Sequence, residues 1–84
     1  MTGSVDDVRA GLAQVVEHLG SAGRYAATAG HLIDDAVAVL AQLSEQHPES
    51  LVPVELRRAV DELQRGIGLI QGGSVAVTDI EARL

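Results

Sequence analysis

The sequence predicts an all-α fold, an antiparallel helical hairpin that pairs with a second copy to form a four-helix bundle. Three observations support this prediction. Apolar or small residues recur in alternating steps of three and four over residues 5–43, Pro48 and Pro53 then interrupt the pattern, and a second apolar stripe follows over residues 56–70. Such spacing places side chains along one side of a helix. We therefore expect residues 1–84 to form a single helical domain.

The first helix is predicted over residues of about 5–46. Ser4, with Asp7 three residues later, resembles a capping box at its start, and Pro48 disfavours a helical conformation for His47 at its end. At 1.5 Å per residue this helix would be roughly 60 Å long. Its stripe consists of Val5, Val8, Leu12, Val15, Leu19, Ala22, Ala26, Ala29, Ile33, Ala36, Leu40 and Leu43.

Small residues replace the branched aliphatic ones over residues 22–30, within the segment SAGRYAATAGHL. A short turn would place position 46 opposite about 54, and hence residues 22–30 opposite 70–78. One interpretation is close packing of two helix backbones over this stretch. The other is a weak point, at which the first helix breaks near residues 20–23 and gives a three-helix bundle. We favour the continuous helix.

The second helix is predicted over about 51–71, with Ser50 as its cap and Pro53 tolerated in its first turn. The Gly72-Gly73 pair predicts a kink or break, because each glycine costs about 1 kcal/mol relative to alanine within a helix. The segment SVAVT alternates like a short strand, whereas TDIE reads as a new capping box. We expect a short C-terminal helix over about 75–84.

The apolar residues over 32–43 spread too widely around the first helix for one partner helix to cover. Their width predicts a second neighbour, supplied most simply by another copy of the chain in a coiled-coil-like bundle. Tyr25, the only aromatic residue, either anchors a partner or merely covers the stripe. The residues predicted to make these helix contacts are Ala22, Tyr25, Ala26, Ala29, Leu32, Ile33, Val37 and Leu40.

Composition narrows the classes of partner. The 84-residue chain is acidic, with a formal net charge of −6, which argues against binding to a phosphate backbone. It has no cysteine, no apolar run long enough to span a membrane and no basic N-terminal segment of a signal peptide. We expect a cytoplasmic protein, with secretion by a signal-independent route left open.

No residue pattern predicts catalysis or a cofactor. His31 and Asp35 lie four residues apart beside Asp34, but two donors on one helix side are fewer than the three or four ligands of a zinc site. We therefore predict no catalytic, cofactor or metal site. The predicted function is a non-enzymatic, self-associating interaction or adaptor module that could also bind another helical protein. The alternative is a small-molecule binding protein that uses a groove beside residues 22–30.

The architecture resembles that of the ESAT-6-like (WXG100) proteins of actinobacteria. Every basic residue is arginine and asparagine is absent, as expected for a genome rich in G and C. The turn carries HPESLVP where the family has W-x-G, and Tyr25 is followed four residues later by Ala29 instead of the acid of the family's C-terminal export signal. The resemblance implies dimeric helical hairpins, exported by a specialised secretion system, that act through protein contacts.

Overall fold

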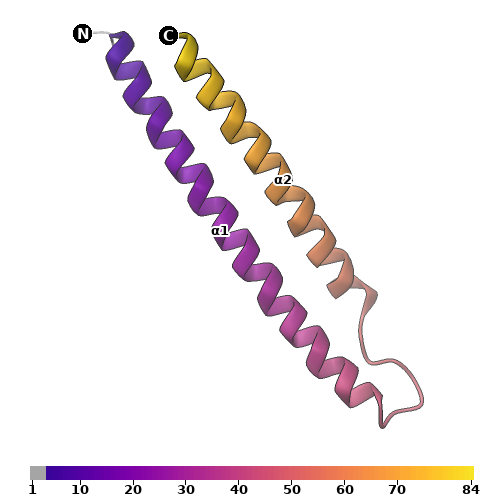
Figure 1. Ribbon diagram of the computed structural model, residues 1–84. Helices are drawn as coiled ribbons and strands as arrows, with labels where there is room; N and C mark the ends of the chain where they lie inside the picture. The colour runs from indigo at the N-terminus through magenta and orange to yellow at the C-terminus, as the bar shows by residue number, and fades with distance from the viewer. Residues whose placement is uncertain (1–3) are drawn as a thin grey trace.

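The chain forms a hairpin of two long antiparallel helices. The computed structural model describes residues 4–84, with α1 over Val5–Ser44 and α2 over Val54–Arg83. The start of α1 and the end of α2 lie at one end of the hairpin, and the loop of residues 45–53 lies at the other (Figure 1). The molecule measures 67 × 17 × 15 Å. The predicted all-α hairpin is confirmed, and no strand occurs in residues 4–84.

The start of α1 is the predicted capping box. The Asp7 backbone N–H donates to Ser4 Oγ at 3.1 Å, and the Ser4 N–H donates to Asp7 Oδ2 at 3.1 Å. These bonds satisfy two donors that a helix start otherwise leaves free. α1 then continues without interruption through residues 20–23, so the alternative of a break there is wrong. It ends at Ser44, two residues before the predicted end.

Ser44 joins the end of α1 to the loop. Its hydroxyl donates to the Leu40 carbonyl at 2.7 Å and accepts from the Leu51 N–H at 2.7 Å. The predicted cap at Ser50 is wrong, because that hydroxyl accepts only from the Val52 N–H within the loop, at 3.3 Å. α2 instead begins after Pro53, whose extended backbone ends the loop without a side-chain cap.

Replacing Ser44 by alanine should lower the free energy of unfolding by about 1 kcal/mol, because it removes both hydrogen bonds of this hydroxyl. The matched control is Ser50→Ala, which loses one long bond within an exposed loop and should change the stability little. Thermal melts of the two variants provide the comparison. A larger loss for Ser50→Ala than for Ser44→Ala would contradict the structure and restore the predicted cap.

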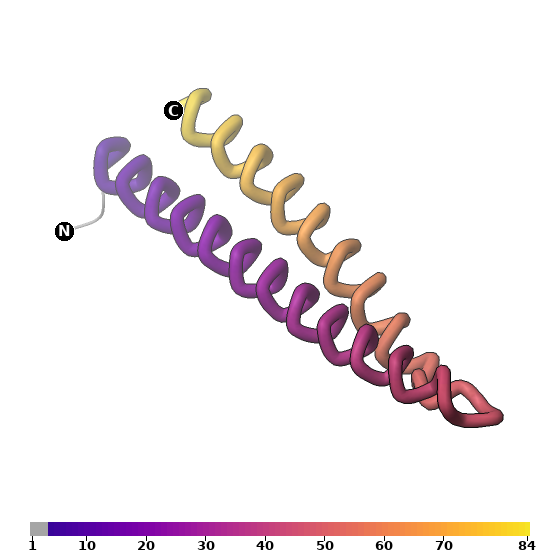
Figure 2. Tube along the Cα trace, turned by 60° about the horizontal axis from the view of Figure 1, so that its bottom comes forward, coloured from indigo at the N-terminus to yellow at the C-terminus, as the bar shows by residue number. Residues whose placement is uncertain are grey.

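α2 is one unbroken helix, so the predicted break at Gly72-Gly73 and the separate C-terminal helix over 75–84 are both wrong. The tube in Figure 2 continues smoothly through this stretch. Residues beyond the glycines remain half-buried against α1, among them Ser74 and Val77. This packing offsets the cost of about 1 kcal/mol for each glycine, because tertiary contacts supply most of the stability of a protein helix.

The two helices meet along one line of half-buried residues, which we call the seam. Its members recur in alternating steps of three and four on both helices. No side chain in residues 4–84 is fully buried. The seam consists of Leu12, Val16, Leu19, Gly23, Ala26, Gly30, Ile33, Val37, Leu40 and Ser44 on α1, and Leu56, Val60, Leu63, Ile67, Ile70, Ser74, Val77 and Glu81 on α2.

Every second residue of the seam differs by one position from the stripe predicted for α1. Leu19 and Ala26 belong to both, but Gly23 and Val37 take the places predicted for Ala22 and Ala36. The sequence is compatible with either choice, because at most of these pairs of adjacent positions both residues are small or apolar. In the structure, the residues that face the large side chains of α2 form the seam.

The register of the two helices also differs from the prediction. Gly23 lies opposite Ile70, and residues 26–34 line a groove together with residues 60–67. The small residues of α1 therefore face Leu63, Ile67 and Ile70 of α2, so that the predicted range of 70–78 is correct only at Ile70. The cause is the loop, which folds back along the last turn of α1, as the bond from the Leu51 N–H to Ser44 shows, and brings Arg57 and Val60 of α2 beside Val37.

Candidate interaction surface

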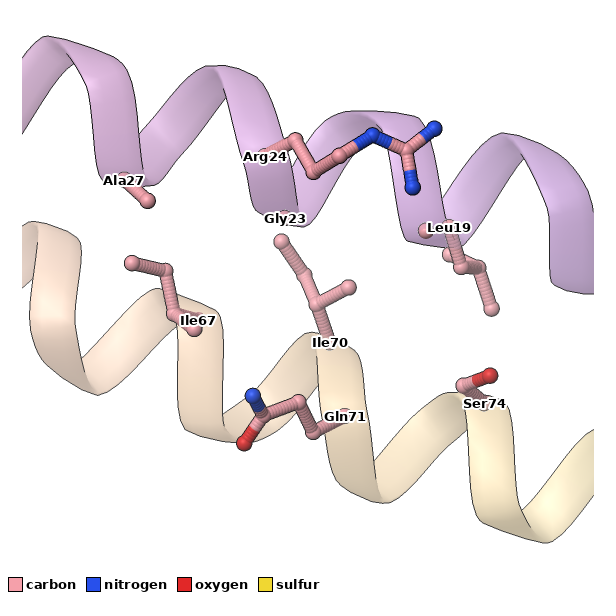
Figure 3. A pocket seen from close by; sticks show the side chains of 9 residues that line it. Leu19, Gly23, Arg24, Ala27, Ile67, Ile70, Gln71 and Ser74 are labelled. Atoms are coloured by element: carbon pink, nitrogen blue, oxygen red, sulfur yellow. The ribbon is translucent and has the colours of Figure 1, made fainter.

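One side of the hairpin carries shallow grooves where small residues of α1 face large residues of α2. The larger groove has a volume of about 340 Å³. Figure 3 shows Ile67 and Ile70 extending from α2 towards Ala27 and Gly23 of α1. A second groove of about 120 Å³ follows along the same side. The larger groove is lined by Leu19, Gly20, Gly23, Arg24, Ala27, Ile67, Ile70, Gln71 and Ser74.

Both glycines of the seam leave room for an added methyl group. A Cβ atom added at Gly23 would be 3.9 Å from Ile70 Cγ2, an ordinary van der Waals distance, and one added at Gly30 would meet nothing within 4 Å. A methyl group therefore fits at both positions. The small residues leave a groove between the helices, and no contact at either glycine is too close for a side chain.

The residues that line these grooves identify the two sides of the hairpin. Besides seam residues, the grooves are lined by the residues that directly follow them, such as Gly20 and Ala27 on α1 and Gln64 and Gln71 on α2. We call this the groove side. The residues that directly precede seam residues must then lie together on the opposite side, because the positions before and after a seam residue flank it on a helix.

This opposite side is an exposed apolar surface along the full length of α1. Six of the seven large apolar side chains that α1 exposes belong to it, with Tyr25 76% and Leu32 63% exposed. The seventh, Val5, lies at the start of the helix. The α1 part of this surface consists of Val8, Val15, Ala22, Tyr25, Ala29, Leu32, Ala36, Val39 and Leu43.

α2 extends the same surface with small and apolar residues. Leu69 is 70% exposed at its middle, and Ile80 is exposed near its C-terminal end. On the groove side α2 exposes Val54 and Val75, which are far apart and form no stripe. The α2 part consists of Ala59, Gly66, Leu69, Gly73, Ala76 and Ile80. We call the combined surface of α1 and α2 the apolar face.

The predicted contact residues divide between two surfaces. Four of them, Ala26, Ile33, Val37 and Leu40, lie in the seam between the helices. The other four, Ala22, Tyr25, Ala29 and Leu32, belong to the apolar face.

The contribution of α2 to the apolar face was missed by the sequence analysis. Its signal is the same as that on α1, a second series of small and apolar residues displaced by one position from the seam. Gly66, Gly73 and Ala76 made this series hard to recognise, because such residues carry little hydropathy. Leu69 is the clearest single indication, since it is large and apolar yet lies outside the predicted stripe of the second helix.

Charged residues on the apolar face are few and separated by sign. Glu55 and Glu62 precede seam residues in the first half of α2, whereas Arg83 lies in its last turn. His18 occupies the same side of α1 towards that end. One end of the face is therefore acidic and the other carries an arginine.

The structure gathers no metal-ligating cluster within residues 4–84, in which no group of three or more His, Asp or Glu side chains could hold an ion. His31 and Asp34 both line the smaller groove, on the side opposite the apolar face. Asp35 is exposed on the helix surface.

Comparisons with known proteins returned no match to a family model, to a curated protein or to a solved structure. The two-helix hairpin is compatible with the architecture of ESAT-6-like proteins. Within residues 4–84, neither helix is both long enough and apolar enough to cross a membrane.

Proposed function

We propose that the protein is a non-enzymatic interaction module that self-associates through its apolar face, two hairpins forming a four-helix bundle. The observation that carries this proposal is the apolar face itself, a set of exposed apolar and small residues along both helices of a hairpin whose seam buries no residue fully. Exposed apolar surfaces of this extent mark sites of protein contact.

The position of the apolar face suits a four-helix bundle. On each helix it is the seam displaced by one residue, and successive residues of an α-helix are separated by about 100°. A helix at the corner of a four-helix bundle contacts two neighbours in directions roughly at right angles. The seam therefore serves the partner within the hairpin, and the apolar face is oriented for a helix of another hairpin.

The exposed area also favours a partner. The hairpin exposes 6297 Å², whereas a compact protein of this mass exposes only about 4,700 Å². The excess of about 1,600 Å² exceeds the roughly 800 Å² that each partner buries in a standard protein interface. A second copy that covers the apolar face would bury part of this excess area.

A more specific form of the proposal is an ESAT-6-like protein, exported by a specialised secretion system, that acts through contact with itself or with another helical protein. The hairpin architecture supports this form. The absence of W-x-G from the loop sequence HPESLVP does not.

A small-molecule binding protein is the second candidate, favoured by the 340 Å³ groove. Its walls are apolar, with Arg24, Gln71 and Ser74 as the polar groups. Arg24 already donates to Ser21 Oγ at 3.0 Å. We rank this candidate second because binding sites usually enclose most of their ligand, and this groove is shallow.

Self-association is tested by size-exclusion chromatography with light scattering over a dilution series. At micromolar concentration we expect the mass of two chains, and on dilution we expect dissociation accompanied by loss of helical circular dichroism. The helicity should fall because a hairpin with no fully buried residue has little stability of its own. A helical monomer at all concentrations would contradict the proposal.

A further inference from the structure

We infer that the second copy docks head to tail on the apolar face, with the two loops at opposite ends of the bundle and the twofold axis passing close to Tyr25 and Leu69. This inference rests on the proposed self-association and specifies its geometry.

Tyr25 and Leu69 occupy the middle of the apolar face. Because Gly23 lies opposite Ile70, Tyr25 is level with Leu69 on the neighbouring helix. They are the two most exposed large apolar side chains within residues 4–84, at 76% and 70%. Residues that contribute most to binding tend to cluster at the centre of an interface. The centre of an interface between identical copies is its twofold axis.

Two twofold arrangements would bring the apolar faces of two hairpins together. With loops at opposite ends, α1 packs against α1 of the second copy and α2 against α2. With loops at the same end, α1 of each copy packs against α2 of the other. Neighbouring helices are antiparallel in both cases, so helix direction does not distinguish the two arrangements. The arrangements differ in which residues the charged side chains of the face meet.

Glu55 and Arg83 lie at equal distances along α2 on either side of Leu69, 14 residues away in each direction. With loops at opposite ends, Glu55 of one copy therefore meets Arg83 of the other, and this pair forms twice. With loops at the same end, Glu55 would instead lie against the apolar Val39. Glu62 meets an apolar residue in both arrangements, Ala76 or Leu32, and does not distinguish them. Placing carboxylates against apolar side chains without a partner is unfavourable. The charges thus favour the head-to-tail arrangement.

The sizes of the side chains agree with this choice. About an axis at Leu69, Gly66 of one copy meets Gly73 of the other, so that two α2 helices can approach closely on both sides of the leucine pair. Ala59 similarly meets Ile80, a small residue opposite a large one. On α1, Val8 of one copy meets Leu43 of the other at each end of the bundle.

Cysteine crosslinking tests the arrangement without interference, because the natural chain has no cysteine. With a short bismaleimide, Tyr25→Cys should form a covalent dimer with itself, and Leu69→Cys should do the same. A mixture of the two variants should yield few mixed dimers. The control Thr28→Cys lies at an exposed position of α1 outside the seam and the apolar face, and it should remain uncrosslinked.

A second pair of variants at the edge of the face keeps the test decisive if changes at its centre weaken the dimer. Residues 8 and 43 are about 52 Å apart along α1, so only a second copy can bring them together. Mixing Val8→Cys with Leu43→Cys should give covalent mixed dimers. Crosslinking of Tyr25→Cys to Leu69→Cys, without the 8–43 product, would overturn the head-to-tail arrangement but retain self-association. A monomeric natural chain in light scattering would overturn the proposed function as well.

Discussion

Replacing Tyr25 by glutamate is expected to weaken self-association about 1000-fold while leaving the hairpin helical at high protein concentration. A central interface residue contributes about 2 kcal/mol or more to binding, and each dimer contains two copies. The combined loss of about 4 kcal/mol corresponds to that factor in Kd. Two carboxylates would in addition face each other near the twofold axis. Light scattering over a dilution series measures the change in Kd.

Thr28→Glu is the matched control for this variant. It adds the same charge to the same helix three residues away, at an exposed position outside the apolar face. It should dimerise like the natural chain, because neither the seam nor the apolar face is altered. Equal weakening by both variants would show that added negative charge, and not the apolar face, controls association in this acidic protein.

Replacing both Gly23 and Gly30 by alanine is expected to raise the free energy of unfolding by about 2 kcal/mol. Each substitution gains about 1 kcal/mol in helix propensity, and neither added methyl group meets an atom closer than 3.9 Å. For a protein of this size, 2 kcal/mol corresponds to a rise in melting temperature of roughly 10 °C. Melts at one fixed protein concentration measure it, since association also affects stability.

Gly72→Ala is the control for this variant, because it changes helix propensity without adding a methyl group to the seam. Gly72 is exposed, lies outside the seam, and has nothing within 4 Å of an added Cβ. It should gain the propensity term alone, about 1 kcal/mol. A fall in melting temperature for the seam variant, with a rise for Gly72→Ala, would mean that α1 and α2 approach more closely at the glycines than the structure shows. It would also restore the interpretation of close backbone packing.

The features that could be predicted from the sequence are those set by local chemistry. The start of α1 follows from the Ser4 and Asp7 side chains, which bond to backbone groups three residues away. The end of α1 could be predicted to within two residues, because the ring of Pro48 restricts the preceding residue and prevents the helix from continuing past it. The continuity of α1 follows from a pattern repeated over eleven steps, which is strong evidence for one helix even where its residues are small.

Features that depend on contact between the helices could not be predicted in the same way. The phase of the seam was ambiguous because Ala22 and Gly23, like Ala29 and Gly30, are adjacent and equally small. Packing against the isoleucines of α2 decides between them. The register depends on the path of the loop, which a hydrogen bond between Ser44 and Leu51 fixes.

The glycine pair in α2 shows the limit of local propensity as a guide. Gly72-Gly73 predicts a break, yet the helix continues because the residues on both sides of the pair pack against α1. Only part of the candidate surface could be predicted from the sequence. The broad distribution of apolar residues on the first helix indicated a second contact surface, while the contribution of α2 emerged only once the helices were placed side by side.

Small-angle X-ray scattering on an absolute scale most directly tests the central claim, that two hairpins pack side by side through their apolar faces. One measurement gives both the mass and the longest dimension of the particle. We expect the mass of two chains within a particle whose length stays close to the 67 Å of one hairpin. A particle of one chain, or a two-chain particle about twice as long, would contradict the account.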